Sequence, residues 1–141
     1  MKSRIIRLTI LVMAVAFLPA LLHAQTVIKT PLFRVDVPFA FMAAGAHLPA
    51  GSYLVSHVDP SLILIETQDG KARALVHVAI ENSNSSTPTK LVFNKYGDQH
   101  FMAQVSTEHD QQVHHCAKSS AERQLVAKAR QAEEVVVLAR R

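Results

Sequence analysis

The chain has 141 residues, of which 15 are Lys or Arg and 11 are Asp or Glu, and it contains one cysteine and four glycines. A single cysteine excludes an internal disulfide, and four scattered glycines do not form the glycine-rich loop of a nucleotide site, so we expect no nucleotide cofactor. Three basic residues and no acidic residue fall within the first 24 positions, which leaves the rest with 12 basic against 11 acidic residues. That balance lacks the basic face that nucleic-acid binding requires.

The first segment of the chain has the layout of a secretory signal peptide. Three basic residues precede an eleven-residue apolar run that stops at Pro19, and a small residue, Ala24, ends the segment. The run is shorter than the roughly 20 apolar residues of a transmembrane helix, and no second long run follows, so we expect no membrane span after cleavage. We predict cleavage after Ala24, with Ala20 as the second choice. Residues 1–24 would then be the signal peptide, and residues 25–141 an exported domain, periplasmic or extracellular.

The clearest strand signal of the exported part is the stretch Leu32 to Met42. Large apolar residues occupy every second position there, a period that places them on one face of a half-buried strand. They are Phe33, Val35, Val37, Phe39 and Phe41. Pro38 has no backbone N–H to give to a ladder, so we predict that this strand is an edge strand or is broken there.

Three further strand signals follow, separated by turns. Leu48 to Ser52 contains a proline and a glycine and predicts a turn before a strand at Tyr53 to Val58. A continuous apolar run, Leu62 to Thr67, and a strand at Ala72 to Ile80 are joined by the favoured hairpin pair Asp69-Gly70. The continuous run indicates either a strand buried on both faces or a surface that receives a partner, and we favour burial.

The middle of the chain predicts a second hairpin. Its strands are Leu91 to Tyr96 and His100 to Thr107, joined around Gly97-Asp98. Glu108 to Lys118 is polar and lacks a clear period, and we interpret it as a solvated loop.

The C-terminal region predicts the one helix. Ser119 and Glu122 have the spacing of a capping box, which predicts a helix near residues 120–131. The β-branched residues 135–138 prefer a strand, with a continuation of the helix as the alternative. Residues 25–141 are therefore expected to form a single, mainly β domain: an antiparallel sandwich or partly open barrel of six or seven short strands with one C-terminal-region helix.

Four short motifs span most of the exported part. They are the strand end Val37 to Phe41, the turn Leu48 to Tyr53, the hairpin Tyr96 to Phe101 and the helix start Ala121 to Leu125. Together they resemble those of a group of small exported bacterial β-rich proteins with no assigned function. The resemblance implies export and a β-rich fold, and it brings no catalytic residue.

His109, His114, His115 and Cys116 form the one local concentration of reactive side chains. Imidazole and thiolate are the usual ligands of zinc and copper, and four of them within eight residues could converge if the segment is a loop. The spacing matches no established metal motif, and adjacent histidines point to opposite sides if the segment is extended. We keep a zinc or copper site as an alternative and otherwise expect no cofactor.

A thiol-dependent enzyme is the other alternative, and it would need Cys116 beside a histidine base and an orienting group. No local signature surrounds Cys116, no Gly-x-Ser-x-Gly turn occurs, and free cysteines tend to be buried. We therefore expect no enzyme. The predicted function is that of an exported, non-catalytic β-domain with a binding or structural role at the cell envelope, its partner an unknown protein or envelope component.

Overall fold

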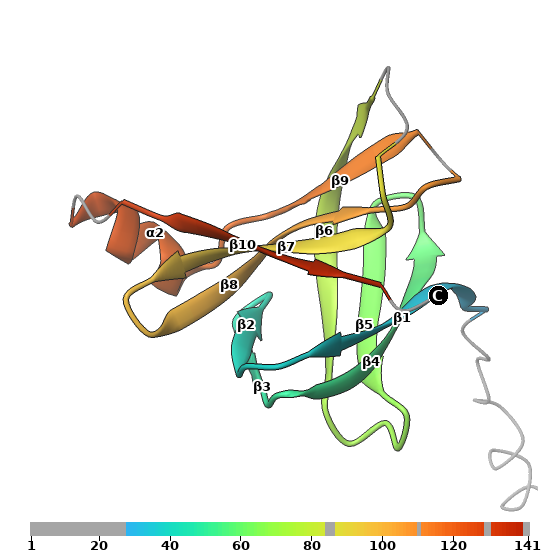
Figure 1. The fold of residues 1–141 in the computed structure, drawn as a ribbon, viewed down its shortest axis with the longest axis horizontal. Coiled ribbons are helices and arrows are strands. Elements are labelled where there is room, and N and C mark those ends of the chain that lie inside the picture. The colour runs from blue at the N-terminus through green and yellow to red at the C-terminus, as the bar shows by residue number, and fades with distance from the viewer. Residues whose placement is uncertain (1–27, 84–86, 110, 129–130, 140–141) are drawn as a thin grey trace, which may run out of the picture.

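The computed structural model describes residues 28–83, 87–109, 111–128 and 131–139, so the predicted signal peptide, residues 1–24, lies outside the described residues. Within these ranges, ten strands and one helix make up the fold (Figure 1). In chain order they are β1 (Thr30–Val37), β2 (Phe41–Ala43), β3 (Ala46–Leu48), β4 (Gly51–Asp59), β5 (Leu62–Thr67), β6 (Arg73–Asn82), β7 (Lys90–Tyr96), β8 (Gln99–Ser106), β9 (Gln112–Cys116), α2 (Ser120–Ala127) and β10 (Glu133–Leu138). No helix in the described part of the chain is long and apolar enough to cross a membrane.

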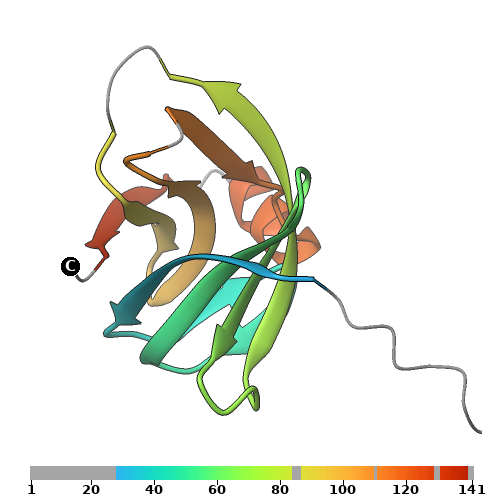
Figure 2. The same ribbon diagram turned by 90° about the vertical axis from the view of Figure 1, so that its right-hand side faces the viewer.

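The strands form one open sheet that folds over on itself (Figures 1 and 2). Hydrogen-bonded neighbours follow the order β1-β4-β5-β6-β9-β8-β2-β3, and β8 also pairs with β7, which carries β10. β6 belongs to both halves, because residues 73–77 pair with β5 and residues 78–82 with β9. β1 and β10 touch, but no ladder joins them within the described residues, so the sheet stays open. This architecture confirms the predicted mainly β fold with one helix.

The core lies between the two halves of the sheet and consists of the apolar residues of its inner face. Phe41 makes edge-to-face contacts with Tyr53 and Phe93, each at 5.2 Å between ring centroids. Such aromatic pairs contribute about 0.5–1.5 kcal/mol beyond the burial of their surface. In β6 burial alternates with a period of two as far as Val78, and the buried residues are Ala74, Val76 and Val78.

The predicted strand Leu32 to Met42 is two strands rather than one. β1 ends at Val37, Pro38 interrupts the ladder, and β2 begins at Phe41 and pairs with the other half of the sheet. Both expectations for Pro38 are confirmed, because the strand is broken there and β1 is also the edge strand of the sheet.

A two-residue turn that we did not predict from the sequence joins β2 to β3. Ala44 and Gly45 have φ angles of 49° and 84°. Two positive φ values are what the commonest tight hairpin loop requires, and Asn-Gly or Asp-Gly is the usual sequence for it. Ala44 carries no such signal, so β3 was not predicted.

The polar segment Glu108 to Lys118 is not the solvated loop that we predicted. Its residues Gln112–Cys116 form β9, which lies between β6 and β8 and is hydrogen-bonded to both. Strands on both sides supply hydrogen-bond partners for its backbone, and these keep the segment extended although its polar residues have a low propensity for β-strands. The division at Pro38, together with β3 and β9, raises the number of strands above the predicted six or seven.

α2 and β10 confirm the predicted end of the chain. α2 begins after Ser119, whose Oγ accepts a hydrogen bond from the backbone N–H of Glu122 at 3.2 Å, as the capping spacing predicts. The helix ends at Ala127, earlier than the predicted residue 131. β10 pairs with β7, so the strand prediction for residues 135–138 is confirmed and the helical alternative is wrong.

Candidate functional site

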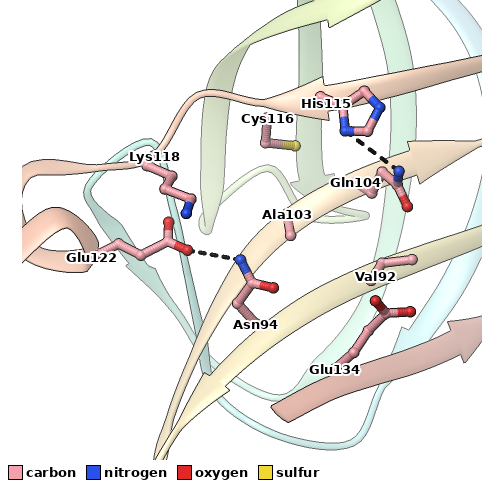
Figure 3. A pocket seen from close by; sticks show the side chains of 9 residues that line it. All are labelled: Val92, Asn94, Ala103, Gln104, His115, Cys116, Lys118, Glu122 and Glu134. Carbon is pink, nitrogen blue, oxygen red and sulfur yellow. Dashed lines mark hydrogen bonds between the residues drawn. The ribbon is translucent and has the colours of Figure 1, made fainter. Parts of the chain in front are cut away.

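A hollow of about 340 Å³ lies on the outer face of the sheet, where β7, β8 and β9 meet the start of α2 (Figure 3). We call it the α2 hollow, and Figure 3 labels the nine residues that line it. Its walls also include a residue of β10 and one of the turn before α2. The volume lies near the lower end of the range of about 300–1,000 Å³ that ligand pockets occupy.

A β-bulge in β8 shapes the hollow. Val92 of β7 lies opposite Gln104, but its neighbour Phe93 lies opposite Met102, so Ala103 is an extra residue in β8. Ala103 and Gln104, at this irregularity, both line the hollow. Bulges re-aim side chains in this way and are common beside functional sites.

His115 projects from β9 into the hollow with its ring held on both sides. Its Nε2 lies 2.8 Å from Oε2 of Glu81, and its Nδ1 lies 3.4 Å from Nε2 of Gln104. Because an ionised carboxylate only accepts and the amide nitrogen of Gln104 only donates, the neutral ring carries its proton on Nε2. These two contacts orient the imidazole.

Glu122 is the buried acid of the hollow, with 2% of its surface exposed although it belongs to the first turn of a surface helix. Its Oε1 accepts a hydrogen bond from Nδ2 of Asn94 at 2.9 Å and another from the Tyr96 hydroxyl at 3.4 Å. Burial, followed by the Glu122 charge, raises the pKa of Tyr96 above its usual value. Glu122 thus ties α2 to β7.

The rim of the hollow carries charges of both signs. Lys118 lies on the α2 side, and Glu134 of β10 lies on the opposite side (Figure 3). Together with Glu122 they give the lining of the hollow one cation and two carboxylates. Such a rim suits a polar ligand that has both hydrogen-bond donors and acceptors.

Cys116 ends β9 and also lines the hollow, but its thiol stays protonated. Burial, followed by the nearby Glu122 carboxylate, raises the pKa of Cys116 to about 12. Only the thiolate attacks electrophiles and binds metals, so the raised pKa disfavours both roles at neutral pH. The pKa agrees with the expectation of an inert cysteine.

The structure brings two of the four predicted metal ligands, His115 and Cys116, to the α2 hollow. His114 points to the other face of β9, where it is fully buried with its ring centroid 4.9 Å from that of His57. His109 lies in an exposed turn before β9. Among residues 28–83, 87–109, 111–128 and 131–139, no group of three or more His, Cys, Asp or Glu is arranged to hold a metal ion. A zinc or copper site stays a prediction.

Sequence reasoning missed the polar residues that other strands bring to the hollow. Asn94, Gln104 and Glu134 lie on three different strands, and no local motif connects them. One signal was available for the first two, since Asn94 and Gln104 each interrupt an apolar stretch. Glu122 is visible in the sequence only as a helix cap.

A second hollow, of about 420 Å³ and mainly apolar, lies over the outer face of β4, β5 and β6. Leu64 and Leu75 line it beside Arg73. Leu64 is 8% exposed there, while Ile63 and Ile65 of the same strand are fully buried in the core. β5 is therefore buried on both faces, as we favoured for its continuous apolar run.

Comparisons of the chain with protein families, with characterised proteins and with solved structures find no match. No residue role can therefore be carried over from another protein. The resemblance to small exported β-rich proteins stays a prediction.

Proposed function

We propose that the chain is an exported, non-catalytic β-domain that binds a small polar ligand in the α2 hollow, at the cell envelope. The observation that carries this proposal is the fixed orientation of the polar side chains in a hollow of ligand size. Gln104 and Glu81 hold the His115 ring, and Glu122 holds Asn94. Because ordering a rotamer-rich side chain on binding costs about 0.5–1.5 kcal/mol, groups that are already ordered favour affinity.

Two features favour binding over catalysis. Cys116 is the strong nucleophile on the wall of the hollow, and its pKa of about 12 keeps it in the thiol form. A thiol enzyme also needs a base that is hydrogen-bonded to the nucleophile. The ring nitrogens of His115 lie against Gln104 and Glu81 instead.

The charges of the hollow favour a zwitterionic or otherwise dipolar ligand. Lys118 offers a cation to a carboxylate, and Glu134 offers a carboxylate to an ammonium or hydroxyl group. Glu122 already accepts two hydrogen bonds, so the exposed Glu134 is better placed to receive the cationic end. A hollow of about 340 Å³ fits a molecule of the size of an amino acid or a monosaccharide.

The proposal of export is supported by the sequence. Basic residues, an apolar run and Ala24 follow one another in the order of a signal peptide. The first described strand, β1, begins at Thr30, a few residues after the predicted cleavage point. Removal of residues 1–24 therefore leaves every described strand intact.

Ligand-observed NMR on residues 25–141 tests the binding proposal. Libraries of amino acids, dipeptides and monosaccharides are screened by saturation transfer, and each hit is titrated against wild type and Gln104→Ala. Gln104→Ala removes the donor that orients His115, so affinity should fall roughly ten-fold, the equivalent of about 1.4 kcal/mol. His47→Ala changes an exposed histidine of β3, a strand that β2 separates from β8, and should leave affinity unchanged. An empty screen, or hits that Gln104→Ala does not weaken, would contradict the proposal.

A further inference from the structure

The second hollow, over the outer face of β4, β5 and β6, combines apolar walls with positive charge. Its volume of about 420 Å³ lies within the range of about 300–1,000 Å³ that ligand pockets occupy. Within the described part of the chain, its lining contains apolar and basic residues and no acidic one. The apolar residues are Val58, Leu64, Ala74 and Leu75, and the basic ones are Lys29 and Arg73.

Two leucines on neighbouring strands form the main apolar surface of this hollow. Leu64 of β5 and Leu75 of β6 are register partners, so their side chains stand next to one another on the same face of the sheet. β4 adds Val58, which lies at an irregularity of the register between His57 and Asp59. Leu75 is 47% exposed, so a ligand that covers it removes apolar surface from water, which is favourable.

The charges beside this apolar surface leave one cation free for a ligand. Nζ of Lys29 lies 2.7 Å from Oε1 of Glu66, so these two charges balance each other. Glu66 is also the register partner of Arg73, but no carboxylate among the described residues forms an ion pair with Arg73. Two cations and one carboxylate leave one net positive charge, and it belongs to the exposed Arg73.

The guanidinium of Arg73 defines the chemistry of the ligand end that it would bind. It offers N–H donors in a planar fork, a geometry that matches the two oxygens of a carboxylate. A neutral apolar ligand would leave this group without a partner, and a cationic ligand would be repelled by it. A small anion without an apolar part would gain nothing from Leu64 and Leu75.

We propose that the second hollow binds a single-chain anionic amphiphile, a carboxylate on an unbranched alkyl chain, as in a fatty acid. Arg73 receives the carboxylate, and the alkyl chain lies along Val58, Leu64 and Leu75. This site is independent of the polar-ligand site, because the second hollow and the α2 hollow share no lining residue. Failure of either proposal leaves the other standing.

A series of chain lengths tests the apolar part of the site. Octanoate, decanoate and dodecanoate are titrated into residues 25–141 by isothermal titration calorimetry, each below its critical micelle concentration. Each further methylene group that the hollow covers should raise affinity by up to about four-fold, until the hollow is filled. Binding that does not saturate, or that is the same for all three chains, would overturn the proposal.

The charge of the head group is tested with a matched ligand. Decyltrimethylammonium has the same ten-carbon chain as decanoate but carries a positive charge, so it should bind at least ten-fold more weakly. Equal affinities for the two ligands would show that the hollow does not select an anion and would contradict the role of Arg73.

Arg73→Gln tests the residue itself. It removes the charge, so affinity for decanoate should fall about ten-fold, whereas Arg73→Lys keeps the charge and should lose less. The matched control is Arg34→Gln, which removes an exposed cation from β1, three strand spacings or about 14 Å from β6. The control should change affinity by less than about two-fold. Wild-type affinity in a folded Arg73→Gln, or an equal loss in the control, would overturn the assignment.

Vesicles of phosphatidylglycerol distinguish one bound molecule from a lipid surface. The proposal predicts that the protein binds decanoate saturably and stays in the supernatant when it is centrifuged with these vesicles. Sedimentation with the vesicles, without saturable binding of decanoate, would mean that the cations face a membrane, and it would overturn the proposal.

Discussion

Replacing Glu122 with alanine should lower the free energy of unfolding by about 2 kcal/mol. The carboxylate is 2% exposed and accepts hydrogen bonds from Asn94 at 2.9 Å and from Tyr96 at 3.4 Å. A hydrogen bond to a charged group contributes about 1.5–3 kcal/mol, and the shorter Asn94 bond should carry most of this because the Tyr96 bond is long. For a domain of this size, the change corresponds to a melting temperature lower by roughly 8 °C.

Thermal melts followed by circular dichroism measure this loss. Glu134→Ala is the matched control, since it removes an exposed carboxylate from the same hollow and should cost less than about 0.5 kcal/mol. A second readout is the titration of Tyr96, whose pKa is raised by burial and by the Glu122 charge and should fall toward its usual value in Glu122→Ala. If Glu122→Ala melts within about 2 °C of wild type, or if the control costs as much, Glu122 does not tie α2 to the sheet.

Ser119→Ala should remove the cap of α2 and cost about 1 kcal/mol in urea titrations, and an unchanged midpoint would contradict the capping role. Ala44→Gly should stabilise the protein by about 0.4–1 kcal/mol, and Gly45→Ala should destabilise it, because both positions have a positive φ that glycine adopts more easily than alanine. A melting temperature that falls in Ala44→Gly and rises in Gly45→Ala would refute the turn geometry. Burial raises the pKa of Cys116 from 9.0 to about 12, so between these two pH values the thiol loses its proton in the unfolded chain but keeps it in the folded protein. The free energy of unfolding should therefore fall as the pH rises through this window, and it should not change on this account below about pH 9. Urea melts at about pH 8 and about pH 10.5 should show a smaller fall for Cys116→Ala, and an equal fall in both proteins would contradict the burial of the thiol.

Most of the sheet is predictable because apolar periodicity reports directly on which face of a strand is buried. The bounds Leu62–Thr67 of β5 were predicted to the residue, and the strand predicted at Ala72 to Ile80 matches β6 to within two residues at each end. The cap of α2 at Ser119 was also visible, since a hydroxyl three residues before a glutamate is a local pattern. β10 was predicted because β-branched residues prefer extended backbone.

The remaining elements depend on tertiary contacts that no local pattern encodes. β9 has a polar sequence, and it is extended because β6 and β8 hydrogen-bond to it on both sides. The β2–β3 turn uses Ala44 at a positive φ angle, where sequence rules expect asparagine or glycine. These two elements and the division at Pro38 account for the strands that sequence reasoning missed.

The candidate site was predictable only in part. His115 and Cys116 stood out as metal-binding residue types, but the other polar residues of the hollow are two amides, two carboxylates and a lysine, which lie elsewhere in the chain. The pairing of β8 with β9 places Gln104 opposite His115, and no local pattern in the sequence predicts that pairing. The pKa of Cys116 follows from its burial, which becomes visible only once β9 is placed in the sheet.

The central claim, that the α2 hollow is a prearranged binding site, is tested most directly by two-dimensional NMR of isotope-labelled residues 25–141 titrated with the amino-acid, dipeptide and monosaccharide libraries. The side-chain amide signals of Asn94 and Gln104 report on the α2 hollow itself, and the backbone signal of Leu64 reports on the second hollow, over β4, β5 and β6. The account predicts that a ligand shifts both amides in a saturable manner and leaves Leu64 unchanged. If no compound moves the two amides, or if the shifts gather around Leu64 instead, the α2 hollow is not the binding site.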